Sequence, residues 1–213
     1  MNIMIEGLAC LEGGDISLKV KLSDAGNFEI KNLVVPPEEW RRLGLAPGRV
    51  LSESEFDELE SAADFRKAVI KGLELLAYGA NSRRAIERKL KMRGHDPEIA
   101  ARAADYLAEK RYINESSDAQ SVLRSGLAKG YGRSRIIMKL REGGYGEEAI
   151  SEVREQLEEI DFVARCADLV RKKYGSVPAD KKAAEKIAAS LVRYGYSYSE
   201  IKDAFRLLAQ ERE

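Results

Sequence analysis

Apolar and polar residues alternate in the first 50 positions, and this pattern predicts β-strands. Residues 16–22 alternate strictly, which is the period of two expected of a half-buried strand. Turn-forming residues flank this run at 13–15 and 23–27, and further strand candidates lie at 3–11 and 28–35. We therefore expect a small sheet of three or more strands, which needs another element to pack against.

From Ser52 onward the pattern becomes helical. Ser52 and Glu55 have the spacing of a capping box, and apolar residues then recur three or four positions apart. The change of pattern places a boundary near residues 52–62. We predict a small β-rich domain followed by three helical repeats, with the bounds 1–60, 61–114, 115–160 and 161–213.

An internal repeat supports this division. The segments 85–96, 135–146 and 186–197 align on Gly94, Gly144 and Gly195, which are 50 and 51 residues apart. Isoleucine stands eight positions before each glycine and leucine four positions before it: Ile86, Ile136 and Ile187, and Leu90, Leu140 and Leu191. An isoleucine and a leucine four apart share one face of a helix, so each pair is expected in the core.

Each repeat has room for three helices. The aligned glycine is expected to end the second helix in a left-handed conformation, and a third helix then begins at Asp96, at Gly146, or at Ser197 with Glu200. A first helix fits ahead of each motif, at about 65–78, 116–129 and 161–174. The predicted fold is therefore mainly α: three tandem three-helix repeats, elongated, after a small β-rich N-terminal domain.

The glycines of the segment KGYGRSRIIMKLREGGYG, residues 129–146, could form either a phosphate cradle or turns. The run G-Y-G-R-S-R does not match the dinucleotide fingerprint, because its sixth position is Arg135 and no βαβ pattern surrounds it. The repeat instead places these glycines at the ends of helices, and we predict turns.

Few residues suit catalysis or metal binding. The only histidine, His95, stands where the other repeats have tyrosine, which favours packing. Cys10 and Cys166 lack metal-ligand spacing and are interpreted as free thiols in a reducing compartment. We expect no catalytic residue, metal or cofactor, and no membrane span or signal peptide, and we place the protein in the cytoplasm. An enzyme built on an unrecognised Lys/Glu site is the minor alternative.

The net charge is zero but unevenly distributed. Residues 1–60 hold six Lys/Arg and twelve Asp/Glu, whereas residues 66–143 hold eighteen and nine. The second helices of repeats one and two carry most of the candidate binding residues, which are Arg83, Arg84, Arg88, Lys91, Arg93, Lys129, Arg133, Arg135, Lys139 and Arg141. A basic region of this kind indicates a polyanionic or acidic partner, although a solvated helix surface has the same composition. Because few aromatic residues accompany the cations, DNA contact is expected at the phosphate backbone.

Several ordered motifs resemble the bacterial RecX family of RecA regulators. They are N-S-R-R-A-I-E-R-K-L-K-M-R-G, then Tyr112-Ile113-Asn114, then K-G-Y-G-R-S-R-I-I-M-K-L-R-E-G-G, and then V-R-Y-G-Y-S-Y-S-E-I, within residues 64–213. The resemblance implies a helical-repeat protein that lodges in the groove of a RecA–DNA filament. It also implies restraint of RecA ATP hydrolysis, strand exchange and co-protease activity, and hence regulation of DNA repair and the SOS response, with no catalytic residues.

One position departs from the family pattern. Asp118 stands where the family usually has an aromatic residue, and Phe162 and Val163 supply comparable bulk in repeat three. We expect a monomer whose partners are the RecA filament and, through phosphates, DNA. The alternatives are an independent, backbone-directed DNA-binding protein and a helical scaffold for an unrelated protein.

Overall fold

The computed structural model describes residues 2–176 and 180–210, which form two compact units. The first unit comprises residues up to 79 together with 86–113, and the second comprises 80–85 together with the residues from 114 onward. The cores of the sheet and of repeat one belong to the first unit, and the core shared by repeats two and three belongs to the second.

The first unit begins with an antiparallel sheet in the order β3-β2-β1-β4. Its strands are β1 (Asn2–Cys10), β2 (Ile16–Asp24), β3 (Asn27–Val35) and β4 (Val50–Leu51). The three long strands confirm the sequence prediction, and the apolar positions of β2 are buried as their alternation requires. Strand β4 is not predicted by the sequence, because two residues are too short to show a period.

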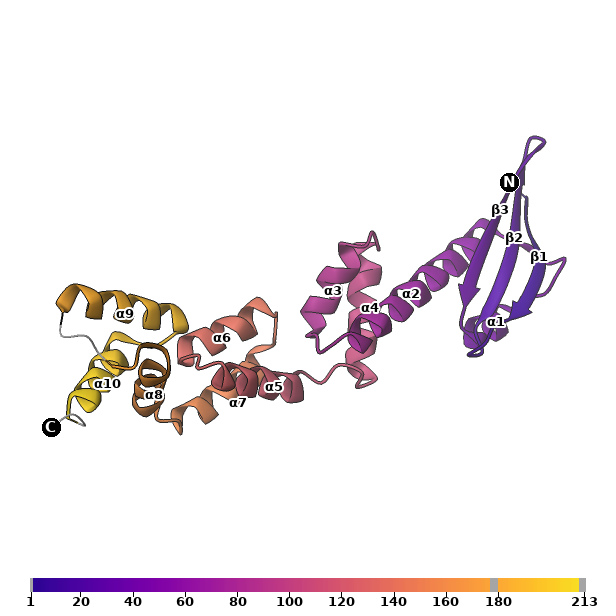
Figure 1. The fold of residues 1–213 in the computed structure, drawn as a ribbon. Coiled ribbons are helices and arrows are strands. Elements are labelled where there is room, and N and C mark those ends of the chain that lie inside the picture. The colour runs from indigo at the N-terminus through magenta and orange to yellow at the C-terminus, as the bar shows by residue number, and fades with distance from the viewer. Residues whose placement is uncertain (1, 177–179, 211–213) are drawn as a thin grey trace. The chain divides into compact units, whose positions relative to one another are not determined.

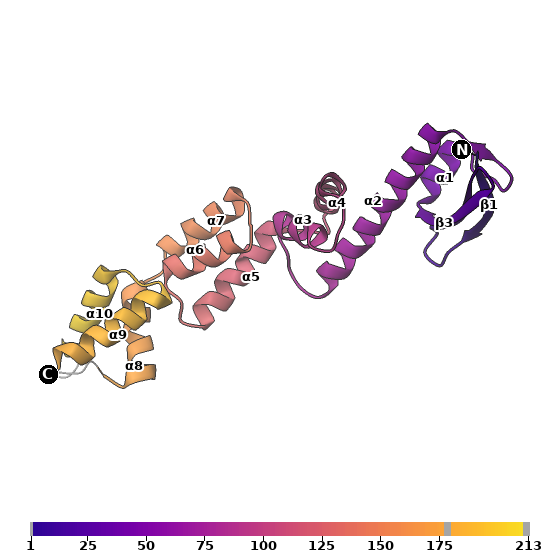
Figure 2. The same ribbon diagram turned by 90° about the horizontal axis from the view of Figure 1, so that it is seen from above.

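A single long helix, α2 (Glu53–Ala77), follows the short helix α1 (Pro37–Leu43). The predicted capping box is present at its start, where the Glu55 amide donates to the Ser52 hydroxyl and the Ser52 amide donates to the Glu55 carboxylate. The sequence predicts the first helix of repeat one only at about 65–78, and that start is wrong. Figure 2 shows α2 as one uninterrupted helix that runs from the sheet to α3 and α4.

Helix α2 is long because it serves two cores. Its first half places Phe56, Leu59 and Ala63 in the core beneath the sheet. Its second half places Ala68 and Val69 in a separate core with α4. An apolar stripe continues through both halves, so no helix-ending signal separates the sheet from the first helical repeat.

The remaining helices of the first unit complete repeat one. They are α3 (Arg83–Lys91), whose first three residues belong to the second unit, and α4 (Pro97–Glu109). Ile86 and Leu90 are fully buried, and the Asp96 carboxylate accepts hydrogen bonds from two amides at the start of α4, as predicted. Gly94 has the predicted left-handed conformation, with φ +85°.

The second unit contains two further three-helix repeats. Their helices are α5 (Glu115–Ala128), α6 (Arg133–Glu142), α7 (Glu147–Glu158), α8 (Phe162–Tyr174), α9 (Lys181–Tyr194) and α10 (Tyr198–Gln210). Ile136, Leu140 and Leu191 are almost completely buried, and Ile187 is 8% exposed, in one shared core. Helices α5 and α8 begin within one residue of the predicted positions. The fold class is confirmed, whereas the domain bounds at 60, 114 and 160 stay predictions.

Candidate partner-binding surface

The start of helix α6 is fixed by the end of α9 rather than by a capping side chain. The Gly132 amide donates to the Tyr194 carbonyl at 2.8 Å, and the Ser134 amide donates to the Gly195 carbonyl at 3.2 Å. Figure 1 shows the two helices meeting end to end within the second unit. Free amides at a helix start and free carbonyls at a helix end thus satisfy one another. The contact fixes the first turn of α6, which carries Arg133 and Arg135.

Segment 80–85 meets the end of α6 in a related way. The buried Ser82 hydroxyl donates to the Gly143 carbonyl at 2.6 Å. Glu115 completes the contact, because its carboxylate accepts from the Arg83 amide at 2.8 Å and from the Gly146 amide at 2.7 Å. Glu115 therefore connects the first residues of α3 to the start of α7.

The basic residues of α6 lie beside aromatic rings. Arg133 lies over Phe162, 5.4 Å from the ring centroid, while Arg135 and Lys139 lie 6.0 and 5.6 Å from the centroid of Tyr131. The rings hold the cations by cation–π attraction without neutralising them. Aromatic residues thus position charge here, a role the sequence did not indicate.

The α6 surface, which we define as Lys129, Arg133, Arg135, Lys139 and Arg141, carries uncompensated positive charge. None of these five residues has a carboxylate within 4.0 Å among the residues that the structure describes. Lys129 and Arg141 are exposed, and the other three are partly exposed. Positive charges at this density repel one another unless an anion lies nearby, so the surface suits an acidic or phosphate-bearing partner.

The α3 residues differ among themselves. Arg84 and Arg88 are exposed and have no carboxylate partner in the described part of the chain. Lys91 pairs with Glu87 at 2.6 Å, and Arg93 donates to the Lys89 carbonyl at 3.1 Å. Lys91 and Arg93 are therefore weaker candidates than the sequence suggested, because part of their hydrogen-bonding capacity is used within the helix.

The glycines of segment 129–146 lie at helix ends, as the repeat predicted. Gly130 and Gly144 have φ of +73° and +75°, Gly132 precedes α6 and Gly143 follows it. A Cβ added to Gly132 would lie 2.4 Å from the Gly195 carbonyl, so this glycine is already covered by backbone of another helix end. The turn interpretation holds, and binding capacity belongs to the cations beside these turns.

Asp118 is partly buried at the position where an aromatic residue was expected. It borders a hollow of about 450 Å³ between α5 and α6, together with Tyr131, Lys139 and Tyr145. Burial, with a smaller effect from the nearby Glu115 carboxylate, raises the pKa of Asp118 above its usual value. Phe162, in contrast, is buried against Tyr196 at the start of repeat three.

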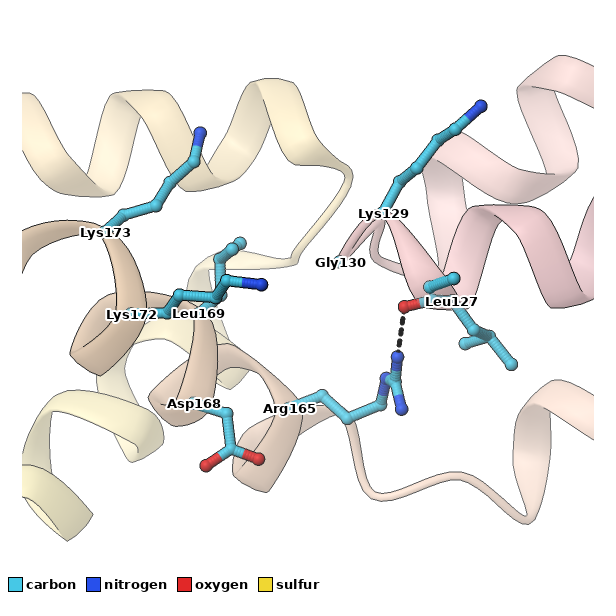
Figure 3. A pocket seen from close by; sticks show the side chains of 9 residues that line it. Leu127, Lys129, Gly130, Arg165, Asp168, Leu169, Lys172 and Lys173 are labelled. Carbon is cyan, nitrogen blue, oxygen red and sulfur yellow. Dashed lines mark hydrogen bonds between the residues drawn. The ribbon is translucent and has the colours of Figure 1, made fainter.

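A second hollow was missed by sequence reasoning. It lies between the end of α5 and α8 and adds Arg165, Lys172 and Lys173 to Lys129 (Figure 3). Lys172 and Lys173 lie in the first helix of repeat three, outside the aligned motifs. Only their charge and their place in the last turn of α8 could have indicated them.

The remaining candidates for chemistry are few. Among residues 2–176 and 180–210, no three His, Cys, Asp or Glu side chains are grouped so that they could hold a metal ion. Cys166 is fully buried, and burial raises the pKa of its thiol to about 12, which makes it unreactive. No helix in this described part is long and apolar enough to cross a membrane.

The fold and this surface define a class: an α-helical repeat protein with an N-terminal sheet and an unneutralised basic surface on its repeated helix. A scan against models of known protein families finds no match. Regulatory protein RecX of Halorhodospira halophila is 34% identical over 133 residues, which cover 62% of this chain and 82% of that protein. Regulatory protein RecX of Streptococcus sanguinis is 30% identical over 186 residues, covering 86% and 71%. The chain belongs to the RecX family of regulatory proteins.

Solved structures agree on the fold. A crystal structure of regulatory protein RecX superposes with a TM-score of 0.71 at 21% identity, over 94% of this chain and 99% of that one. The crystal structure of RecX from Lactobacillus salivarius gives 0.57 at 21% identity, over 69% and 97%. The family resemblance noted in the sequence is confirmed.

Proposed function

We propose that this protein is a non-catalytic regulator that binds the RecA–DNA filament. In this role it modulates, and mostly inhibits, RecA ATP hydrolysis, strand exchange and co-protease activity, and so regulates DNA repair and the SOS response. The observation that carries the proposal is the α6 surface, five cations without carboxylate partners in the described residues, on a chain that belongs to the RecX family.

The chemistry of this surface suits a filament of protein and DNA. Arg133 and Arg135 can each donate two parallel hydrogen bonds to a carboxylate or a phosphate, and Lys129 and Lys139 act as point charges. Because the Phe162 and Tyr131 rings beside the α6 surface already lie against its cations, we expect contacts with DNA to go to the backbone and to be independent of sequence.

A scaffold role fits the rest of the molecule. Its one half-buried histidine and unreactive buried thiol support regulation by binding. We place the protein in the cytoplasm, where RecA and DNA are found, and we propose that it acts as a monomer.

A second function must also be tested, because the same cations would bind DNA in the absence of RecA. An independent DNA-binding protein would bind single- or double-stranded DNA with a steep dependence on salt and would leave RecA unaffected.

The experiment is a titration of RecA ATPase on single-stranded DNA with the full chain, paired with direct DNA binding measured against salt. Inhibition at protein concentrations well below those that saturate naked DNA supports the filament regulator. Strong DNA binding with no change in ATPase supports the alternative, and the absence of both overturns both proposals.

A further inference from the structure

The hollow between the end of α5 and helix α8 has the chemistry of an anion site. It has a volume of about 360 Å³, and its lining includes Lys129, Arg165, Asp168, Leu169, Lys172 and Lys173. The lining therefore contains three lysines, one arginine and one carboxylate. They come from the end of α5 and from α8, which are distant in the sequence.

The single carboxylate is already engaged. Asp168 pairs with Arg171 at 2.5 Å, and Figure 3 shows its oxygens directed away from the three ammonium groups. Lys129 and Lys172 have no carboxylate within 4.0 Å among the described residues. The local charge of the hollow is therefore positive.

The other two cations are held in place. Lys173 donates to the Tyr194 hydroxyl and lies 4.2 Å from the centroid of that ring, and this hydrogen bond raises its pKa. Arg165 donates to the Leu127 carbonyl, which fixes its guanidinium at the end of α5. Its Nε–H is buried and has no hydrogen-bond partner among the described residues.

We propose that this hollow binds a phosphodiester group of the DNA backbone. The inference rests on the proposed function and assigns part of its DNA contact to repeats two and three. The accessible cations that line the hollow are ammonium groups, which bind a phosphate as point charges, whereas the one guanidinium in the lining already donates to a carbonyl. The walls are Leu169 and Gly130, with no ring available to stack on a base, so the backbone rather than a nucleobase is the ligand.

The site continues the α6 surface. Lys129 borders both this hollow and the one that Tyr131 and Lys139 line. Lys129 therefore links the two hollows, so a strand bound at Lys129 can extend toward Lys139 on one side and toward Lys172 on the other.

The test compares two double variants of the full chain. Lys129→Ala with Lys172→Ala removes two charges from the hollow, and Lys186→Ala with Lys202→Ala removes two from exposed positions outside it. Affinity for a fluorescent oligothymidylate is measured between low and physiological salt, with thermal melting as the check on folding. We expect the first variant to bind about tenfold more weakly at low salt. We also expect the slope of log K against log salt to fall by about 0.7 for each phosphate that the variant no longer neutralises.

The control is expected to keep the wild-type slope. Equal slopes for both variants would overturn the inference, and so would a loss of RecA inhibition without any change in DNA binding, because the hollow would then contact protein. If the hollow variant loses DNA affinity while the wild-type chain never affects RecA, the site stands and the proposed regulatory function fails.

Discussion

The backbone of Gly132 lies directly against the backbone of Gly195. A Cβ added to Gly132 would lie 2.4 Å from the Gly195 carbonyl carbon, and a Cβ added to Gly195 would lie 2.4 Å from the Arg135 amide nitrogen. Repeats two and three are therefore joined backbone to backbone, and the same contact supports the first turn of the α6 surface.

The first prediction concerns Gly195→Ala. Gly195 has φ +96°, and the new methyl group would press on backbone that no rotamer change can move. We expect the free energy of unfolding to fall by about 2–4 kcal/mol, measured by chemical denaturation.

Gly94→Ala is the matched control. Gly94 occupies the equivalent position of repeat one with φ +85°, but a Cβ added there would have no atom within 4 Å. Its substitution should cost only the backbone strain, about 1 kcal/mol. Equal losses for the two variants would show that the close approach of the two backbones contributes nothing.

The second prediction concerns Glu115, whose carboxylate accepts hydrogen bonds from the Arg83 and Gly146 amides. Glu115→Ala removes this charged acceptor from both amides, and we expect a loss of about 2–4 kcal/mol in denaturant unfolding. Glu115→Gln keeps one carbonyl oxygen and should lose less. Glu155→Ala, an exposed glutamate on α7, should change stability little. A neutral effect of Glu115→Ala would contradict the bridging role.

Most of the helical architecture could be predicted from the sequence because the repeat is regular. Isoleucine and leucine at fixed distances from each glycine located the second helices and their buried faces, and the caps at Asp96 and Ser197 located the third helices. The length of α2 escaped prediction: the capping box marks its start at Ser52, but its apolar stripe continues without interruption from the sheet core into the helical core.

The candidate surface was predicted only in part. The repeat located the basic residues of α3 and α6, but the Phe162 ring beneath Arg133 comes from repeat three, and the Tyr131 ring beside Arg135 lies outside the aligned segments. Lys172 and Lys173 were missed for the same reason. Their proximity to Lys129 arises from packing between repeats, and a periodic pattern within one helix contains no information about it.

The third prediction concerns Asp118. Its pKa is raised in the folded state, mainly by burial, so folding favours the protonated carboxyl group. Stability therefore increases as pH falls from neutral through the raised pKa toward the unfolded value. Asp118→Asn should stabilise the protein at pH 7, and the gain should disappear near pH 3.5, below the ordinary pKa of aspartate. A gain of equal size at both pH values would contradict the assignment.

The fourth prediction concerns alkaline pH. Burial raises the pKa of Tyr196 to about 12 from 10.0, and its hydroxyl donates to the Gly130 carbonyl at 3.1 Å. Folding therefore favours the neutral phenol, so stability is retained below pH 10 and is lost as pH rises toward 12, by up to about 1.4 kcal/mol per pH unit.

Cys166 behaves in the same way from about pH 9, since burial raises the pKa of its thiol to about 12. Tyr196→Phe removes one hydrogen bond but should flatten the stability profile above pH 10 in denaturant melts. Cys166→Ala should flatten it mainly between pH 9 and 10, because an exposed thiol, with an ordinary pKa of 9.0, ionises about one pH unit before an exposed phenol. Profiles that match the wild-type curve would contradict the burial of these two groups.

The central claim is that the basic residues of α3 and α6 bind a RecA–DNA filament. The most direct measurement compares RecA ATPase on single-stranded DNA in titrations with the wild-type chain and with a variant that carries Arg84→Glu, Arg88→Glu, Arg133→Glu and Arg135→Glu. A matched variant reverses four charges on α9, at Lys181, Lys182, Lys186 and Arg193. We predict that the wild-type chain and the α9 variant inhibit the ATPase and that the α3/α6 variant does not. Undiminished inhibition by a folded α3/α6 variant would contradict the account.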